Sequence, residues 1–86
     1  MKVILHKRFE KQYAKLRLAE KERFKTRRNV FLRNPFDPIL NNHGLSGKYQ
    51  GCNSINITGD LRAVYMMFDS QTAFFIAIGS HSQLYK

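Results

Sequence analysis

Several residue types are scarce in this sequence, and each scarcity excludes a class of protein. Cys52 is the single cysteine, so no disulfide can form within the chain and no second thiol is present for a zinc knuckle. No apolar run approaches the roughly 18 residues that cross a bilayer. Lys2, His6 and Lys7 interrupt the N-terminal apolar stretch before it could act as a signal peptide. We therefore expect a cytoplasmic protein without a membrane partner.

Acidic residues are also scarce, with six Asp or Glu against fifteen Lys or Arg, and the net charge is +9. The excess is confined to one segment, because residues 1–33 hold twelve basic and three acidic residues, whereas residues 34–86 hold three of each. Such a basic flank can bind a nucleic-acid backbone, an anionic membrane or an acidic protein. Charge alone does not choose among these partners.

The apolar residues, 43% of the 86-residue chain, suffice for one compact core. Phe9, Tyr13 and Leu16 recur at helical spacing, whereas Ile55 and Ile57 alternate with polar residues as in a strand. The predicted elements are a strand at 2–6, helices at about 7–17 and 20–33, a loop at 35–51, strands from about 50, at 61–68 and at 72–78, and a tail or helical turn at 81–86. One kinked helix over residues 7–33 is the alternative to two.

This order of elements predicts a single α+β domain spanning residues 1–86. The N-terminal strand and two helices are expected on one face of a mostly antiparallel four-stranded sheet. The opposite face is then left for the loop, the hairpin and the tail. A functional site is expected there.

Side chains that can transfer protons or hold phosphate gather in the C-terminal half. Asp60 and Arg62 are two residues apart, which predicts that they project from the same face of a strand. Across the hairpin, Asn56 has a parity that could place it opposite them. His43 lies in the preceding loop and His81 directly after the last strand, so four segments could converge.

Cleavage of RNA without a metal requires a base for the 2′-OH, an acid for the departing 5′ oxygen, and fixed positive charge. Either histidine can act as acid or base near neutrality. Arg62 and Lys48 are candidates for the positive charge, and Tyr85 or Tyr49 could stack an unpaired base. No cofactor is expected.

Each of these residues also has a purely structural interpretation. His43 could brace its loop, Asp60 could be a turn residue, Arg62 could form a cross-strand ion pair, and Tyr85 could fill the core. Cys52 has no evident partner base and is a poor candidate for a nucleophile. A metal site of two histidines and one aspartate is disfavoured, because the spacings match no compact ligand motif.

Three segments resemble one family: residues 42–47 (NHGLSG), 55–65 (INITGDLRAVY) and 78–85 (IGSHSQLY). In order and spacing they are similar to the RelE/ParE superfamily of bacterial toxin–antitoxin toxins, and within it to the YafQ-like branch. The specific resemblance covers most of residues 35–86. The N-terminal helices resemble the family only in layout.

The resemblance implies a ribosome-dependent endoribonuclease that cleaves mRNA in the ribosomal A site and is blocked by an acidic antitoxin. It implies a monomeric free toxin and a higher assembly with antitoxin and operator DNA. The catalytic positions that it implies are His43, Asp60, Arg62, His81 and Tyr85. The expected substrate-binding residues are Lys48, Tyr49 and Asn56. The residues expected to contact ribosomal RNA are Lys7, Arg8, Lys11, Lys15, Arg23, Arg27 and Arg28.

Within this resemblance, His81 is expected to be the general acid, His43 the base or a group that orients it, and Asp60 a tuning residue. Two departures stand out. Asn56 occupies a position where YafQ-like toxins carry a histidine, and residues 51–54 (GCNS) lack an arginine that relatives usually show. Two alternatives stay open: a ParE-like toxin that arrests DNA gyrase without cutting, and a weakened member that only binds RNA or antitoxin.

Overall fold

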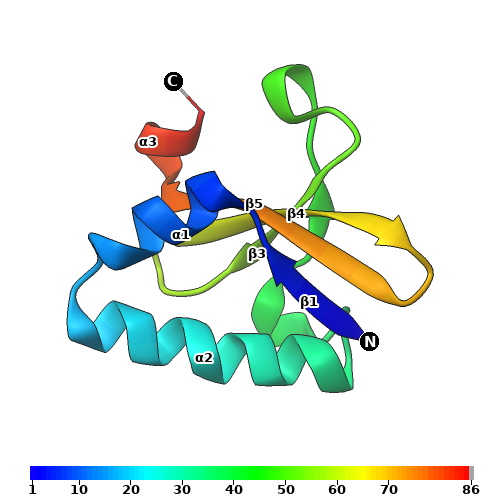
Figure 1. Cartoon of the computed structure of the whole chain (residues 1–86), viewed down its shortest axis with the longest axis horizontal. Helices are drawn as coiled ribbons and strands as arrows, with labels where there is room; N and C mark the ends of the chain where they lie inside the picture. The colour runs from blue at the N-terminus through cyan, green and yellow to red at the C-terminus, as the bar shows by residue number, and fades with distance from the viewer. Residues whose placement is uncertain (86) are drawn as a thin grey trace.

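The structure, a computed structural model, describes residues 1–85 (Figure 1). The elements in chain order are β1 (Lys2–Leu5), α1 (Lys7–Ala14), α2 (Leu18–Arg33), the 3₁₀ helix η1 (Pro38–Leu40), β2 (His43–Gly44), the 3₁₀ helix η2 (Gly47–Tyr49), β3 (Asn53–Asn56), β4 (Leu61–Asp69), β5 (Thr72–Ser80) and α3 (His81–Leu84). The predicted α+β class is confirmed.

The sheet has five strands in the order β1-β5-β4-β3-β2. β1 pairs with β5 in parallel, and the other neighbours are antiparallel. The predicted count of four strands is therefore wrong. The additional strand, β2, has only two residues and lies in a polar, irregular stretch, so it carries no alternation from which it could be predicted. β4 is central, as expected.

The two predicted helices are separate elements, so the single kinked helix is wrong. α1 ends at Ala14, earlier than predicted, because the amides of Lys15 and Leu16 donate to the carbonyls of Gln12 and Tyr13 in a tight turn. α2 begins at Leu18, and the carboxylate of Glu20 accepts a hydrogen bond of 3.1 Å from the Arg17 amide. α2 ends at Arg33, immediately before Asn34-Pro35, as the loss of a backbone donor at proline predicts.

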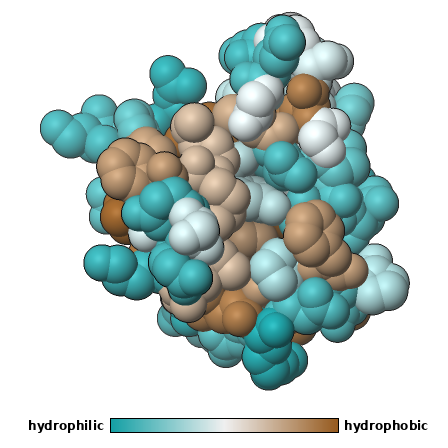
Figure 2. Space-filling view, turned by 90° about the vertical axis from the view of Figure 1, so that its right-hand side faces the viewer, coloured by the Kyte–Doolittle hydropathy of each residue, from teal (hydrophilic) through white to brown (hydrophobic). Residues whose placement is uncertain are grey.

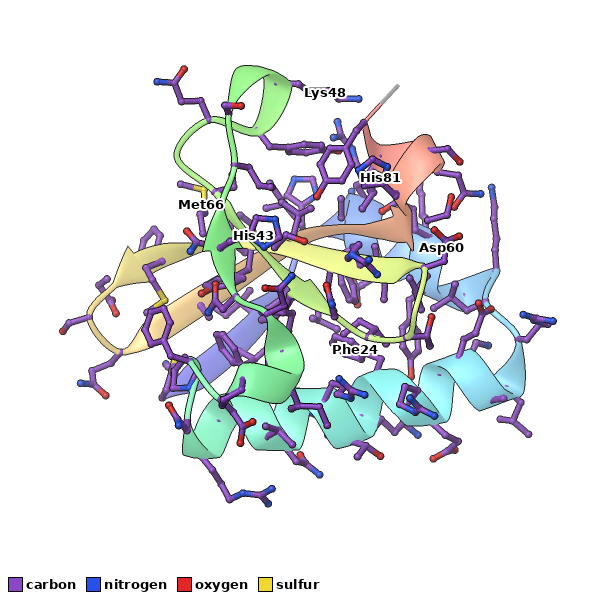
Figure 3. The ribbon with its side chains drawn as sticks, turned by 180° about the vertical axis from the view of Figure 1, so that it is seen from behind. Phe24, His43, Lys48, Asp60, Met66 and His81 are labelled. Atoms are coloured by element: carbon purple, nitrogen blue, oxygen red, sulfur yellow. The ribbon has the colours of Figure 1, made fainter. Side chains whose placement is uncertain are left out.

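The larger core lies between the sheet and helices α1 and α2. Phe9 from α1 and Phe24 from α2 pack with ring centroids 5.2 Å apart, and Phe31 lies 5.4 Å from Phe75 of β5. Figure 3 shows Phe24 between the sheet and α2. Each such aromatic pair contributes about 0.5–1.5 kcal/mol beyond the burial of its area. The helices are thereby fixed to one face of the sheet.

The opposite face carries a smaller core beneath η2 and α3. It contains the buried residues Tyr49, Cys52, Val64, Ala77 and Leu84. Figure 1 shows the η2 segment and α3 on the side of the sheet away from α2. This small core holds the loop and the tail over the sheet, and the space between them forms the site described below.

The far end of the β4–β5 hairpin is more exposed. Met66, Met67 and Phe68 on β4 and Ile4 on β1 are 40%, 44%, 75% and 46% exposed. Figure 2 views the molecule from the side of this hairpin and shows apolar side chains reaching the surface among hydrophilic ones. Within residues 1–85, no helix has both the length and the apolar character needed to cross a bilayer.

Candidate active site

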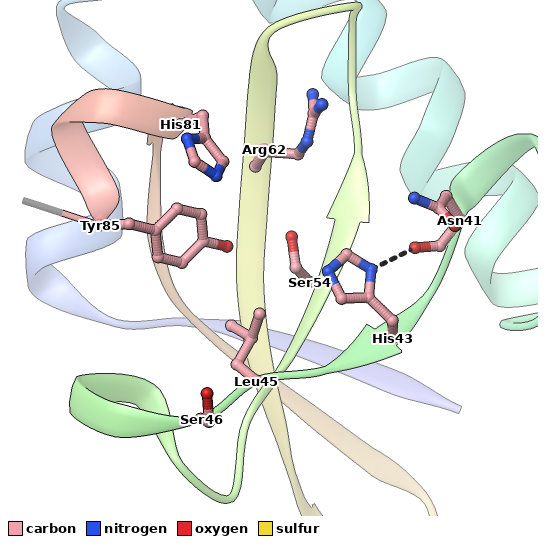
Figure 4. Close-up of a pocket in the computed structure, with 8 residues that line it drawn as sticks. All are labelled: Asn41, His43, Leu45, Ser46, Ser54, Arg62, His81 and Tyr85. Carbon is pink, nitrogen blue, oxygen red and sulfur yellow. Dashed lines mark hydrogen bonds between the residues drawn. The ribbon is translucent and has the colours of Figure 1, made fainter.

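A cleft of about 310 Å³ opens on the sheet face opposite the two long helices. Figure 4 shows its lining, which comes from η1 and β2 on one side, β3 and β4 at the base, and α3 on the other side. The lining residues are Asn41, His43, Leu45, Ser46, Ser54, Arg62, His81 and Tyr85. Four residues predicted to be catalytic, from distant segments of the chain, therefore line one cleft.

His43 reaches the cleft from β2, and a backbone carbonyl contacts one of its two ring nitrogens. Its Nδ1 atom lies 2.8 Å from the carbonyl oxygen of Asn41. Because a carbonyl only accepts, Nδ1 carries the proton in this contact, and Nε2 of the neutral ring keeps a free lone pair. Asn41 presents this carbonyl from a left-handed backbone conformation, with φ 47° and ψ 48°. Asparagine tolerates this conformation better than most residues.

The loop that carries His43 is anchored by a polar network centred on Asn42. The Asn42 side-chain amide donates to the carbonyl of Pro35 at 2.8 Å and to the hydroxyl of Tyr65 at 2.7 Å. Asn53 on β3 donates to the Asn42 carboxamide oxygen at 3.1 Å. Burial raises the pKa of the Tyr65 phenol, and the hydrogen bond from Asn42 opposes this effect in part. The network ties β2 to β3 and to the central strand.

Arg62 and Asn56 lie directly opposite each other on β4 and β3, as their parity predicts. Nη1 of Arg62 donates to the carbonyls of Thr58 at 3.0 Å and Leu61 at 3.4 Å. These bonds hold the guanidinium at the hairpin end and use only one of its nitrogens. Arg62 also lines the cleft, and its other N–H groups make no hydrogen bond within residues 1–85. A guanidinium with free N–H groups can bind phosphate through paired hydrogen bonds.

The third wall of the cleft is α3, which presents two rings one helical turn apart. The His81 and Tyr85 rings lie 4.7 Å apart between centroids, and Tyr85 meets Tyr49 edge-on at 6.0 Å. Ser80 caps this short helix by accepting from the amide of Gln83. Tyr49 is only 7% exposed. Its ring is thus largely covered and lies against Tyr85, and its role in base stacking stays a prediction.

Asp60 and Lys48 do not line the cleft. Asp60 lies in the turn before β4, so the alternation that predicted a shared face with Arg62 does not extend to it. It lines a separate polar depression of about 370 Å³, together with Lys15 and Arg17. Figure 3 shows Asp60 at the hairpin end, away from His43. Lys48 is exposed on η2, and its Nζ lies 5.4 Å from the centre of the Tyr49 ring.

The predicted RNA-contacting cations lie on α1, α2 and the turn between them, and most are exposed. Arg27 differs, because its Nη1 donates to the carbonyl of Ile39 at 2.8 Å. This contact holds η1, which leads into Asn41. Arg27 therefore has a structural partner that the charge pattern does not reveal, whereas the side chain of Arg23 makes no hydrogen bond or ion pair within residues 1–85.

Cys52 is buried in the small core, and burial raises the pKa of its thiol. A raised pKa lowers the fraction of nucleophilic thiolate at neutral pH. Among residues 1–85, no group of three or more His, Cys, Asp or Glu side chains is arranged to hold a metal ion. Because Asp60 faces a different depression, the alternative of two histidines and one aspartate lacks its carboxylate.

Comparison with known families identifies the chain. A family model described as "Bacterial toxin of type II toxin-antitoxin system, YafQ" matches residues 1–86. The chain belongs to the YafQ toxin family. It is thus a toxin of a type II toxin–antitoxin system, and the predicted YafQ-like family is confirmed. A comparison with curated protein sequences found no match.

Solved structures of the YafQ fold align over nearly the whole chain. YafQ from Escherichia coli is 18% identical, with 98% of this chain and 97% of that chain covered and a TM-score of 0.78. The toxin in the E. coli DinJ–YafQ toxin–antitoxin complex is also 18% identical, with 98% of this chain and 96% of that chain covered and a TM-score of 0.75. A conserved hypothetical protein from Helicobacter pylori is 31% identical, with 99% of each chain covered and a TM-score of 0.69. These matches confirm the RelE-like arrangement of helices on a sheet.

Three residues of the site were not predicted from the sequence as functional. Asn41 orients His43, Asn42 anchors its loop, and Ser54 lies at the base of the cleft. The Asn41-Asn42 pair does carry a turn signal, since asparagine favours left-handed and side-chain-bonded turns. For Ser54, the only sequence signal was the alternation of apolar and polar residues, which places it on the polar face of β3.

Proposed function

We propose that this YafQ-family toxin is an endoribonuclease that cleaves mRNA on the ribosome without a metal ion. The observation that carries the proposal is the cleft in which His43 and His81, from opposite walls, flank Arg62. Two imidazoles beside a guanidinium provide the base, the acid and the positive charge that attack by a 2′-OH on phosphorus requires. The family supports the role as a toxin, and the residues of the cleft support the proposed cleavage chemistry.

His43 is the proposed base. Its Nδ1–H is fixed on the Asn41 carbonyl at 2.8 Å, so Nε2 is the atom that takes the proton from the 2′-OH. The 2′ oxygen then bonds to phosphorus, and the bond from phosphorus to the 5′ oxygen breaks. The products are a 2′,3′-cyclic phosphate and a 5′-OH end. Neither an oxidant nor a second substrate is needed.

His81 is the proposed acid, and it gives a proton to the departing 5′ oxygen. Arg62 stabilises the additional negative charge on the phosphate oxygens. Asn56 lies opposite Arg62 in the sheet, its side-chain oxygen makes no hydrogen bond within residues 1–85, and it stays a proposed substrate-binding residue. Tyr85 is half-buried in the cleft and offers a ring face to a base next to the scissile phosphate. Asp60, in its separate depression, is left without a step in the chemistry.

The ribosome and an antitoxin are the proposed partners. Twelve of the fifteen cations lie in residues 1–33, most of them on α1 and α2, which cover the sheet face opposite the cleft. There they can contact ribosomal RNA while the cleft faces the mRNA. The related E. coli toxin was solved in complex with DinJ. By analogy, an acidic antitoxin is expected to neutralise this chain.

The test compares the three histidines of the chain, each replaced by asparagine. His43→Asn and His81→Asn are expected to lower the rate of mRNA cleavage on programmed ribosomes by about 10²–10⁴-fold, the usual contribution of a general acid or base. His6→Asn is the matched control. Nδ1 of His6 accepts from the amide of Arg8 and caps α1, a role that asparagine can take.

The product ends distinguish the proposal from its alternatives. A 2′,3′-cyclic phosphate, insensitivity to EDTA, and loss of cleavage when the attacking ribose lacks its 2′-OH are the expected results. Unchanged cleavage by His43→Asn and His81→Asn would overturn the assignment of the two histidines. Intact mRNA together with arrested gyrase would instead support the ParE-like alternative, and intact mRNA with salt-sensitive RNA binding would support the weakened member.

A further inference from the structure

The base of the cleft contains a buried hydroxyl that the proposed chemistry does not use. Ser54 is fully buried, and its Oγ makes no hydrogen bond within residues 1–85. A buried hydroxyl without a partner loses its hydrogen bonds to water, so nearly all such groups in proteins are paired. Ser54 nevertheless lines the cleft, which places this unpaired group beside the residues assigned to catalysis.

Ser54 lies directly opposite His43 in the antiparallel pairing of β2 with β3. Side chains opposite each other in such a pair share a face and have Cβ atoms about 4.5–5.5 Å apart. Figure 4 shows the Ser54 hydroxyl on the side of the His43 ring away from the Asn41 contact, between that ring and Tyr85. Nε2 of His43 is therefore the ring nitrogen nearer to this hydroxyl.

The two protonation states of His43 make different demands on their surroundings. The neutral ring satisfies Nδ1–H on the Asn41 carbonyl and leaves Nε2 as an acceptor. Once Nε2 has taken a proton, both nitrogens are donors, and the second N–H requires an acceptor. Among the polar groups at the base of the cleft, Ser54 Oγ is buried and has unused acceptor capacity.

We propose that Ser54 is a positioning residue whose hydroxyl accepts a hydrogen bond from Nε2–H of protonated His43. The inference rests on the proposed function for its role in cleavage, since the proton concerned is the one taken from the 2′-OH. The hydroxyl then stabilises the imidazolium that forms as the 2′ oxygen attacks phosphorus. The imidazolium sits between two acceptors, the Asn41 carbonyl and Ser54 Oγ.

Other charged or titratable groups face the same imidazole. Arg62 from β4, and His81 and Tyr85 from α3, line the cleft with His43. Their charges act on His43 in the parent and in any variant at position 54 alike. A comparison of variants at this position therefore isolates the contribution of the hydroxyl.

The first experiment needs no RNA. The ring signals of His43 are followed by NMR during a pH titration of the parent, Ser54→Ala, Ser54→Cys and Ser70→Ala. Ser54→Ala removes the hydroxyl, Ser54→Cys keeps the volume with a much weaker acceptor, and Ser70, exposed in the β4–β5 turn, is the control. We expect His43 to protonate about one pH unit lower in both Ser54 variants, and at the parent's pH in Ser70→Ala.

The second experiment separates this proposal from the proposed function. The second measurement is the rate of mRNA cleavage on ribosomes as a function of pH. The rate falls at acidic pH as the base His43 becomes protonated, and Ser54→Ala is expected to move this fall in the same direction as the NMR titration. A shift in the NMR titration without any cleavage by the parent would contradict the proposed nuclease and leave the contact intact. Identical His43 titrations in the parent and both folded Ser54 variants would overturn the role of Ser54, whatever the cleavage assay shows.

Discussion

Nδ1 of His43 lies 2.8 Å from the carbonyl oxygen of Asn41, two residues earlier, and this contact fixes which ring nitrogen faces the cleft. It depends on the backbone of Asn41, the one residue other than glycine with positive φ within residues 1–85. η1 supplies this geometry, since Asn41 is its C-cap and its amide donates to the carbonyl of Pro38. A local turn thus sets the direction in which His43 can accept a proton.

The left-handed backbone of Asn41 gives the first prediction. Asn41→Gly, which adopts positive φ freely, is expected to keep the stability of the parent to within a few tenths of a kcal/mol. Asn41→Val is expected to lose about 1–2 kcal/mol and to cleave more slowly, because a β-branched residue is strained at this φ and releases the carbonyl from His43. Urea unfolding and a cleavage assay check both variants. Equal stability of the glycine and valine variants would contradict this account.

Two arginines of α2 are predicted to differ although both belong to the basic flank. Arg23→Gln is expected to leave the melting temperature unchanged, weaken RNA binding, and reduce the slope of log K against log salt by about 1. Arg27→Gln is expected to lower the melting temperature, because the carbonyl of Ile39 loses its donor. Thermal melts and RNA titrations at several salt concentrations make the comparison. If both variants change only RNA affinity, the contact between Arg27 and Ile39 has no structural role.

The buried thiol of Cys52 is predicted to be unreactive in the folded protein. Because burial raises its pKa, less thiolate is present at pH 8 than for an exposed cysteine, and iodoacetamide should react slowly until denaturant is added. Cys52→Ala is expected to keep the cleavage rate. Rapid alkylation under native conditions, with loss of cleavage, would instead point to Cys52 as a functional nucleophile.

The β4–β5 turn is predicted to make stability depend on acidic pH. The backbone amide of Gln71 donates to the carboxylate of Asp69 at 2.8 Å, and this bond, with Thr72 and the charge of Lys2, lowers the Asp69 pKa. A carboxyl with a lowered pKa stabilises the fold above the pKa of its unfolded state and loses that contribution as pH falls through its folded value. The difference in melting temperature between the parent and Asp69→Asn should therefore be present at pH 6 and shrink toward pH 2.5. A difference that does not change with pH would contradict this assignment.

The parts of the fold that follow from alternation were predictable from the sequence. Ile55 and Ile57 lie in the larger core, while Ser54 lines the cleft on the other face, as period two requires. The end of α2 was predictable because a proline follows it. β2 was not predictable, since two residues cannot show a period, and its pairing depends on the contacts of β3.

The site was predictable in its main side chains and not in its supporting contacts. His43, Arg62, His81 and Tyr85 converge because the meander brings strand ends together. Asp60 was placed incorrectly because strand alternation was extended into a turn, where it does not apply. Asn41 carries only a general turn signal, which does not reveal that its carbonyl contacts His43. The unpaired hydroxyl of Ser54 leaves no trace in residue type, because it depends on the tertiary position of its neighbours.

The most direct test of the assignment of base and acid replaces the 5′ bridging oxygen of the scissile phosphate by sulfur. A thiolate departs without protonation, so a substrate of this kind does not need the general acid. On programmed ribosomes carrying this mRNA, His81→Asn is expected to approach the parent's cleavage rate, whereas His43→Asn is expected to remain slow. A His81→Asn variant that stays as slow on the sulfur substrate as on the oxygen substrate would contradict the account.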